Sequence, residues 1–299
     1  MGDDGSMPTG FLVLANASAG SADDEAVAAV VEGLGSAGPV DVARTGSDDE
    51  VDAVLADLAG RVLVVAGGDG SVHTAVARLR SLGLAGSVAV GLVPLGTGND
   101  LARGVAIPGE PVEAAELIAT GHEARPADLI VDDAGGVVVN AVHAGLGAEA
   151  ADRAASLKGT LGPLAYPLGA LIAGVRESGW DLEVTTDGTV VHEGPALMVG
   201  VGNGSSIGGG TELFPHALVD DGQAEVVVVT AVGATARAAF GSALRSADHL
   251  DRDDVLALRA ADIVVSGDPV RHNADGEVGD EIRRRRYTIE PGAWRLIRP

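Results

Sequence analysis

The sequence of 299 residues contains no cysteine, a single lysine and few aromatic side chains. The absence of cysteine excludes disulfide bonds and thiolate metal sites. Because 43 acidic residues stand against 20 basic ones, the formal net charge is −23, and the basic residues other than Lys158 are arginines. A surface this acidic repels the phosphates of nucleic acids and of anionic membranes. The composition therefore argues against a nucleic-acid-binding protein.

The acidic residues are spread along the whole chain rather than gathered in one tail. We interpret this distribution, with so little lysine, as an adaptation to high salt. Molar salt shortens the Debye length to about 3 Å and removes the self-repulsion that opposes compaction. We therefore expect a halophilic protein whose stability depends on salt.

The chain also lacks long apolar runs. No uninterrupted run reaches the ~18 residues that a membrane-spanning helix requires. The first residues, Met-Gly-Asp-Asp-Gly-Ser, have neither the basic nor the apolar region of a secretory signal. We expect a cytoplasmic protein with at most peripheral contact with a membrane.

From about residue 10 to 120, short apolar runs alternate with amphipathic stretches, which is typical of strand–helix units in a parallel sheet. Ligands of open α/β sheets bind beyond the carboxyl ends of the strands, so a site is expected in the turns that follow them. The predicted strands are Phe11–Ala15, Val62–Ala66 and Val88–Val93, and the predicted helices are 22–35 and 71–82.

After Pro126 the pattern becomes rich in β-like runs, with only two helical candidates, near 148–156 and 164–176. A proline and polar residues between 120 and 127 suggest a linker. We therefore predict an α/β domain over residues 1–125 and a β-rich domain over residues 126–299, whose C-terminal strand can return to the first domain. The β-like runs are Val137–Val142, Leu197–Val201, Glu225–Val229 and Ile263–Val265.

The sharpest local signal is Gly67-Gly68-Asp69-Gly70-Ser71, between a predicted strand and a predicted helix. Glycines allow backbone N–H groups to approach phosphate oxygens, and the helix N-terminus attracts anions. A plain tight turn explains the glycines as well. Asp69 favours the phosphate interpretation with a cation present, because an acid would otherwise repel the ligand.

A second loop, Pro94-Leu95-Gly96-Thr97-Gly98-Asn99-Asp100-Leu101, also follows a strand and opens a helix. Asn99 or Asp100 is alternatively a helix N-cap. Two such loops on adjacent strand ends nevertheless indicate one shared ligand. A third loop, Asn16-Ala17-Ser18-Ala19-Gly20, follows the first strand, but there a helix cap is at least as good an explanation.

Two acidic turns lie in the second half of the chain. Glu277 in Asp275-Gly276-Glu277 is the kind of group that accepts a hydroxyl proton during phosphoryl transfer. In so acidic a chain, however, the residues alone favour a solvated Asp–Gly turn. Asp220-Asp221-Gly222 has two interpretations, a hairpin turn or an oxygen-rich cation site.

Other chemistries find little support. The seven histidines show no metal-ligand spacing, and no Gly-x-Ser-x-Gly elbow is present. The arginine run Arg283–Arg286 is interpreted as a salt-bridged strand face rather than a nucleic-acid patch.

Taken together, these motifs resemble the diacylglycerol kinase catalytic family, which includes bacterial lipid kinases and sphingosine kinases and is distantly similar to NAD kinase. The resemblance covers nearly the whole chain. The motifs that carry it, in order, are Asn16–Gly20, Gly67–Ser71, Pro94–Asp100, Gly-Asn-Gly at 202–204, Pro215–Gly222 and Asp275–Glu277.

The resemblance implies an α/β nucleotide-binding domain with a parallel sheet, a β-sandwich second domain, and ATP in the cleft between them. It implies Glu277 as the general base, with Asp69 as a second catalytic residue, and weakly favours a homodimer. The ATP-binding positions that it implies are Asn16, Ala17, Ser18, Ala19, Gly20, Thr45, Gly67, Gly68, Asp69, Gly70, Ser71, Val72, His73, Gly96, Thr97 and Asn99.

The resemblance also implies Mg²⁺. Asp69, Asp100 and Asp128 match acids of a water and Mg²⁺ network near the phosphates. A second, structural Mg²⁺ is expected at Asp221, with the backbone carbonyls of two further residues, Leu218 and Gln223. A hard cation with oxygen ligands offsets charge on the transferring phosphoryl group.

We therefore expect an ATP- and Mg²⁺-dependent kinase that phosphorylates a hydroxyl group of a lipid. Thr74 stands where many family members carry glutamate, so a catalytically silent nucleotide-binding regulator is one alternative. An NAD kinase is another, although the Gly96–Asp100 motif and the late Asp-Gly-Glu argue against it.

Overall fold

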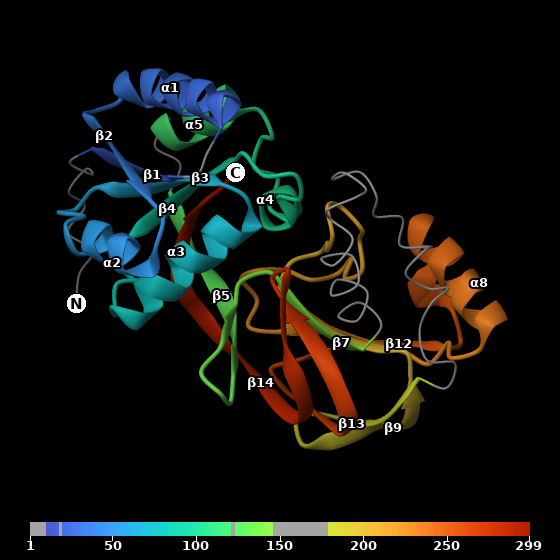
Figure 1. Ribbon diagram of the computed structural model, residues 1–299. Coiled ribbons are helices and arrows are strands. Elements are labelled where there is room, and N and C mark those ends of the chain that lie inside the picture. The colour runs from blue at the N-terminus through green and yellow to red at the C-terminus, as the bar shows by residue number, and fades with distance from the viewer. Residues whose placement is uncertain (1–9, 18–19, 121–122, 146–178) are drawn as a thin grey trace. The chain divides into compact units, whose positions relative to one another are not determined.

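The computed structural model describes residues 10–17, 20–120, 123–145 and 179–299 (Figure 1). The chain divides into two compact units. The first consists of Met1–Ala127 together with Gly292–Pro299, and the second consists of Asp128–Pro291.

The first unit is built on a parallel sheet with the strand order β4-β3-β1-β2, and the end of β14 (Glu277–Ile297) pairs with β4 in parallel. The register places Ala15 opposite Ala66 and Gly67 opposite Pro94, so the strands end at the same edge of the sheet. This confirms the predicted parallel α/β domain. The strands are β1 (Phe11–Asn16), β2 (Val40–Thr45), β3 (Val62–Gly67) and β4 (Ala89–Pro94).

Among the described residues of this unit, five helices accompany the sheet: α1 (Ser21–Gly35), α2 (Asp48–Ala56), α3 (Asp69–Ser81), α4 (Asp100–Gly104) and α5 (Pro111–Ala119). In Figure 1, α1 and α5 lie on one face of the sheet, and α2 and α3 lie on the other. Both faces are therefore covered, which explains why the strands are continuous apolar runs rather than alternating ones. Val13, Leu63, Val64 and Val90 are fully buried between the helix layers.

The predicted helices at 22–35 and 71–82 are present, and each begins within two residues of the expected position. Strand β2 was not predicted, because its exposed Asp41 and Arg44 interrupt the apolar run. The prediction of a linker over 120–127 is wrong for the second half of that range. Strand β5 (Ala124–Asp132) begins there and contains Pro126.

The second unit is dominated by antiparallel strands in the order β12-β11-β10-β7-β13-β14. The hairpin of β8 and β9 pairs with β13, and β5 pairs with β14 and β6. The remaining bounds are β6 (Val137–Val138), β7 (Ala141–Gly145), β8 (Trp180–Thr186), β9 (Thr189–Ala196), β10 (Met198–Gly202), β11 (Ala224–Val229), β12 (Val255–Ala260) and β13 (Asp262–Ala274).

One helix of the second unit was missed. Helix α8 (Ala234–Arg245) contains only two large apolar residues, Phe240 and Leu244, so its apolar stripe is too short to stand out in the sequence. A 3₁₀ turn, His249–Asp251, follows it. The helical candidates at 148–156 and 164–176 lie outside the described residues. Within the part of the chain that the structure describes, no helix is long and apolar enough to span a membrane.

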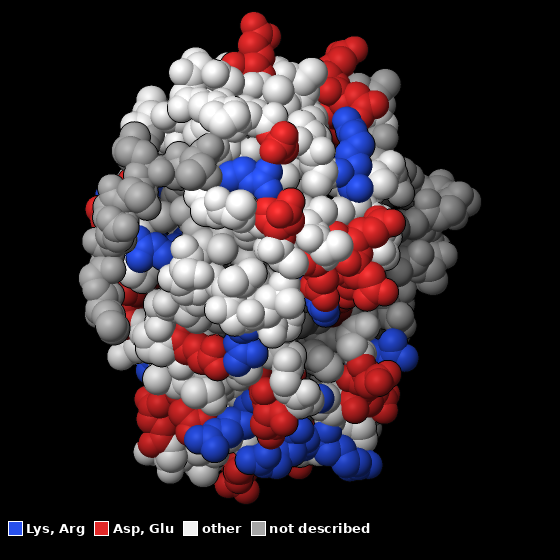
Figure 2. Space-filling view, turned by 90° about the vertical axis from the view of Figure 1, so that its left-hand side faces the viewer, with Lys and Arg blue, Asp and Glu red and all other residues white. Residues whose placement is uncertain are grey.

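The arginine run lies on β14 and is salt-bridged, as predicted. Arg284 pairs with Asp133 at 3.0 Å, and Arg286 pairs with Asp262 at 2.6 Å. The Arg286 guanidinium lowers the pKa of the Asp262 carboxyl. On the face in Figure 2, basic side chains likewise have acidic neighbours. Arg285 also lies 3.4 Å from Asp132, so three of the four arginines of the run are paired with carboxylates.

Candidate active site

The loops after β3 and β4 touch each other through their backbones. The Leu95 amide donates to the Gly67 carbonyl at 3.0 Å. A Cβ atom on Gly96 would lie 2.6 Å from the Cα atom of Gly68, which is closer than Cβ atoms pack. Glycine is thus required at this crossing, and the two loops that the sequence placed on one edge form one structure.

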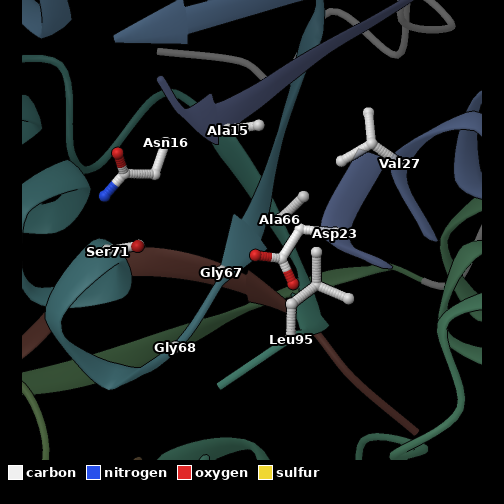
Figure 3. A pocket seen from close by; sticks show the side chains of 9 residues that line it. All are labelled: Ala15, Asn16, Asp23, Val27, Ala66, Gly67, Gly68, Ser71 and Leu95. Carbon is white, nitrogen blue, oxygen red and sulfur yellow. The ribbon is translucent and has the colours of Figure 1, made fainter. Parts of the chain in front are cut away.

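A pocket opens between these loops and the end of β1. Its volume is about 210 Å³, which suits part of a nucleotide rather than a whole one, because drug-sized ligands usually occupy at least ~300 Å³. Figure 3 shows Asn16 and Ser71 on one side of the pocket and Asp23 on the other. The described lining residues are Ala15, Asn16, Asp23, Val27, Ala66, Gly67, Gly68, Ser71 and Leu95.

Asp23 was not singled out in the sequence. It lies in the first turn of α1 and accepts a hydrogen bond from the Gly20 amide at 3.3 Å, as an acid at the third position of a helix often does. The signal was therefore present as Gly20-x-x-Asp23, which begins four residues after the end of β1. Ser18 and Ala19 of the predicted loop lie outside the described residues.

The glycine loop leads directly into α3. Gly68 occupies the N-cap position without a capping side chain, and its carbonyl accepts the Ser71 and Val72 amides at 3.0 and 3.2 Å. Gly67 is required because a Cβ atom there would overlap the Ser71 side chain. The positive end of α3 therefore opens beside the pocket, where a phosphate is favoured.

Not every predicted residue of this loop lies in the pocket. Val72 is buried on α3, Gly70 is exposed at its first turn, and His73 is half-buried. None of the three is among the residues that line the pocket. Their predicted contacts with ATP therefore depend on backbone groups or on parts of the ligand beyond this pocket.

Asn99 has a structural role in its own loop. Its backbone is left-handed, with φ of 52°, and its amide side chain accepts from the Gly96 N–H at 3.1 Å and donates to the Gly96 carbonyl at 2.7 Å. Thr97 is exposed in the same loop. Asn99 therefore shapes the loop, and a predicted direct contact of its side chain with ATP competes with these two hydrogen bonds.

Thr45 lies beside the first loop. It ends β2, is buried, and pairs in register with Asn16. Its carbonyl accepts the Ala17 amide at 2.9 Å. The structure thus brings these three predicted residues together at the carboxyl edge of the sheet.

Two carboxylates converge next to the crossing of the loops. Burial, and secondly the Asp100 charge, raise the pKa of the Asp69 carboxyl. The Leu101 amide donates to Asp69 at 3.4 Å. A Cβ atom on Gly98 would lie 2.7 Å from an Asp69 oxygen and 3.6 Å from an Asp100 oxygen, so both groups reach the same space. Two carboxylates that reach the same space supply the oxygen ligands that Mg²⁺ prefers.

The remaining predicted acids lie in the second unit. Asp128 is buried on β5 and accepts the Gly222 amide at 2.7 Å, which fastens it to the turn that contains Asp221. Asp221 accepts the Gln223 amide at 3.1 Å and forms an ion pair with Arg259. Leu218, in the same segment, is exposed.

The fit to Mg²⁺ therefore differs between the two expected sites. Asp69 and Asp100 have mutually repelling carboxylates, whereas the charge of Asp221 is already offset by Arg259. Among the described residues, no group of three or more histidine or acidic side chains is arranged to hold a metal ion. A metal at Asp69 and Asp100 would thus complete its shell with water or phosphate oxygens.

Glu277 is the first residue of β14, directly after the turn that joins β13 to β14. Its side chain is exposed. The preceding Asp275 carboxylate accepts three backbone amides, so the turn is not simply solvated. This backbone is therefore fixed two residues before the exposed Glu277 carboxylate.

The fold and the loops first define a class: α/β proteins with glycine turns at the carboxyl edge of a parallel sheet, which is where open α/β sheets bind their ligands. Comparison with known proteins identifies the family within this class. Residues 10–131 match the diacylglycerol kinase catalytic domain, and residues 140–298 match the YegS C-terminal NAD kinase beta sandwich-like domain. The chain belongs to the diacylglycerol kinase catalytic family, a family of lipid kinases.

Individual relatives agree with this membership. The chain is 33% identical to the probable lipid kinase YegS-like of Stenotrophomonas maltophilia (strain K279a), over 98% of this chain and 96% of that protein. It is 34% identical to that of Xanthomonas campestris pv. campestris (strain 8004), over 79% and 77%. A crystal structure described as a "putative diacylglycerol kinase" from Bacillus anthracis str. Sterne superposes with a TM-score of 0.81 at 25% identity, covering 97% of both chains. The expected family and its β-sandwich-like second domain are thereby confirmed.

Proposed function

We propose that this protein transfers the γ-phosphoryl group of ATP to a lipid hydroxyl, with Mg²⁺ held by Asp69 and Asp100. The observation that carries the proposal is the crossing of the two glycine loops beside the pocket. Of the described residues that line this pocket, none is Lys or Arg. Backbone N–H groups, the N-terminus of α3 and the metal therefore offset the phosphate charge.

In the proposed reaction, Glu277 accepts the proton of the acceptor hydroxyl. The hydroxyl oxygen forms a bond to the γ-phosphorus, while the bond from that phosphorus to the β,γ-bridging oxygen breaks and ADP leaves. Bound Mg²⁺ would supply charge neutralisation on the phosphate oxygens. Asp128 is proposed as part of the same network through its fixed carboxylate, and Mg²⁺ at Asp221 stays a prediction.

The ATP contacts that we propose lie at the strand ends of the first unit. Asn16 and Ser71 present side chains to the pocket. Gly67, Gly68 and Gly96 supply backbone groups at the crossing. Peripheral attachment to a membrane and a homodimer remain predictions.

The first test is transfer of radiolabelled γ-phosphate from ATP with Mg²⁺, at several salt concentrations, to vesicles of the source organism's total lipid. We expect label in a lipid band with the wild type. In Glu277→Gln we expect turnover to fall at least ~100-fold while ATP affinity stays nearly unchanged, because only proton transfer is removed. Glu281→Gln is the matched control, since Glu281 is also an exposed glutamate on β14.

Three outcomes would contradict parts of the proposal. Equal turnover in Glu277→Gln and the wild type would rule out Glu277 as the base. Label in NAD rather than in lipid, when NAD is offered, would favour an NAD kinase. ATP binding without transfer to any acceptor would favour the silent regulator.

A further inference from the structure

The Gly-Asn-Gly segment at 202–204 has no part in the proposed chemistry, yet it is tied to the turn that carries Glu277. The link is the buried segment Val139, Asn140 and Ala141, which follows β6 and ends on the first residue of β7. These three consecutive amides donate to the Asp275 carboxylate at 2.7, 2.9 and 3.0 Å. Consecutive amides around a carboxylate form an anion-binding nest, in which each hydrogen bond is strengthened by the charge.

Asp275 is also held by its own backbone. It has a positive φ of 49°, followed by Gly276 at 93°, and its amide donates to the Ala141 carbonyl at 2.9 Å. The Gly276 amide donates to the Asn273 side chain at 3.0 Å. Hydrogen bonds at both Asp275 and Gly276 therefore fix the conformation of the turn that precedes Glu277.

Asn140 connects this turn to the Gly-Asn-Gly segment. Its carbonyl accepts the Asn203 and Gly204 amides at 2.8 and 2.9 Å, and its side chain donates to the Ser206 carbonyl at 2.9 Å. The Asn203 side chain in turn donates to the Val139 carbonyl at 2.8 Å. Gly204 has no room for a Cβ atom, because that atom would overlap the Asn140 side chain.

We propose that Asp275 is a positioning residue for Glu277, and that Asn140 with Gly202–Gly204 holds the amides that bind Asp275. This inference rests on the proposed function, since it concerns the proposed base. Glu277 is exposed and begins a strand, so the position of its carboxylate depends on the turn before it. A displacement of about 1 Å at a reacting group can cost ~100-fold in rate.

The test variant is Asp275→Asn, which keeps the size of the side chain but removes its charge. We expect kcat to fall at least ~10-fold while KM for MgATP stays within ~2-fold, because the base is displaced and the ATP loops are not. The matched control is Asp187→Asn. Asp187 also begins an Asp–Gly turn with positive φ, and it accepts the Ala261 and Asp262 amides at 3.2 and 3.0 Å. Both variants are assayed below their melting temperatures.

The double variant Asp275→Asn with Glu277→Gln separates positioning from a general structural role. If Asp275 acts through Glu277, the double variant is as slow as Glu277→Gln alone. Multiplied losses in the double variant, or equal kcat in the Asp275 and Asp187 variants, would overturn the proposal. If Asp275→Asn does not fold, Gly204→Ala is used in the same test. Its control is Gly233→Ala, because a Cβ atom on Gly233 meets nothing within 4 Å.

Amide hydrogen exchange provides a readout that needs no turnover. We expect faster exchange over residues 139–141 in Asp275→Asn and unchanged exchange there in Asp187→Asn. Unchanged exchange in Asp275→Asn would overturn the inference even if the kinase activity is confirmed. Absence of transfer by the wild type would instead reject the proposed function, so the two failures are distinguishable.

Discussion

The charged form of Asp69, which the proposed chemistry needs to bind Mg²⁺, lowers the stability of the folded protein. Its pKa is raised by burial and by Asp100, so the folded state holds its proton to a higher pH than the unfolded state does. Between the unfolded pKa and the raised one, stability falls as pH rises, and the penalty is complete above that window. Such strain is common where a site must bind a ligand that relieves it.

We therefore expect Asp69→Asn to melt a few degrees higher than the wild type at neutral pH without metal, and to lose this advantage as the pH is lowered and Asp69 gains its proton. Turnover in the variant should fall at least ~100-fold, because a charged ligand of the metal is lost. Added Mg²⁺ should stabilise the wild type but not the variant. Calorimetry at several pH values, with and without Mg²⁺, measures the melting temperatures, and the phosphate-transfer assay measures turnover.

The matched control for that experiment is Asp57→Asn. The Asp57 side chain is 91% exposed and 3.8 Å from the Arg61 guanidinium, so its removal should change the melting temperature little. A lower melting temperature of Asp69→Asn at pH 7 would show that the hydrogen bonds accepted by Asp69 outweigh its repulsion from Asp100.

At the scale of elements, the crossing of the β3–α3 and β4–α4 loops leaves no room for a larger side chain. In Gly96→Ala the new Cβ atom would meet the Gly68 backbone and, at 2.8 Å, the Asn99 side chain. Backbone atoms cannot move aside independently, so the loops must separate. We expect ATP affinity to fall at least ~10-fold, with a smaller effect on folding, because the phosphate-binding amides lose their arrangement.

Isothermal titration with ATP and Mg²⁺ measures this loss. Gly109→Ala is the control, since a Cβ atom there meets nothing within 4 Å. Wild-type affinity in Gly96→Ala would mean that the nucleotide does not depend on the crossing, and the proposed phosphate site would be wrong.

In the first unit, the strands that the sequence predicted are those with continuous apolar runs. β1, β3 and β4 are buried on both faces, so each is a plain apolar run between turns. β2 and α8 were missed because β2 carries exposed charge and α8 has a short apolar stripe. Both are recognised only when the neighbouring strand or layer is known.

At the scale of the whole molecule, the net charge of −23 is the dominant electrostatic term. We expect the melting temperature to rise by at least several degrees between 0.1 M and about 3 M NaCl, because screening removes the repulsion among carboxylates. Sucrose at equal osmolality is the control, since it is excluded from the surface but does not screen. An equal rise in sucrose, or none in NaCl, would contradict the halophilic interpretation.

The sequence by itself determined the class of fold, the order of the motifs and the positions of the glycine turns, because these follow from local apolar pattern and backbone freedom. The glycines at 67, 68 and 96 belong to this group. The family resemblance, not spacing, pointed to Glu277.

Only the tertiary structure decided which of these residues act on one another. The approach of Gly68 to Gly96, the ion pair of Asp221 with Arg259, and the three amides that bind Asp275 all join residues far apart in the chain. Such contacts depend on strand register and on the packing of layers, which a local pattern does not specify.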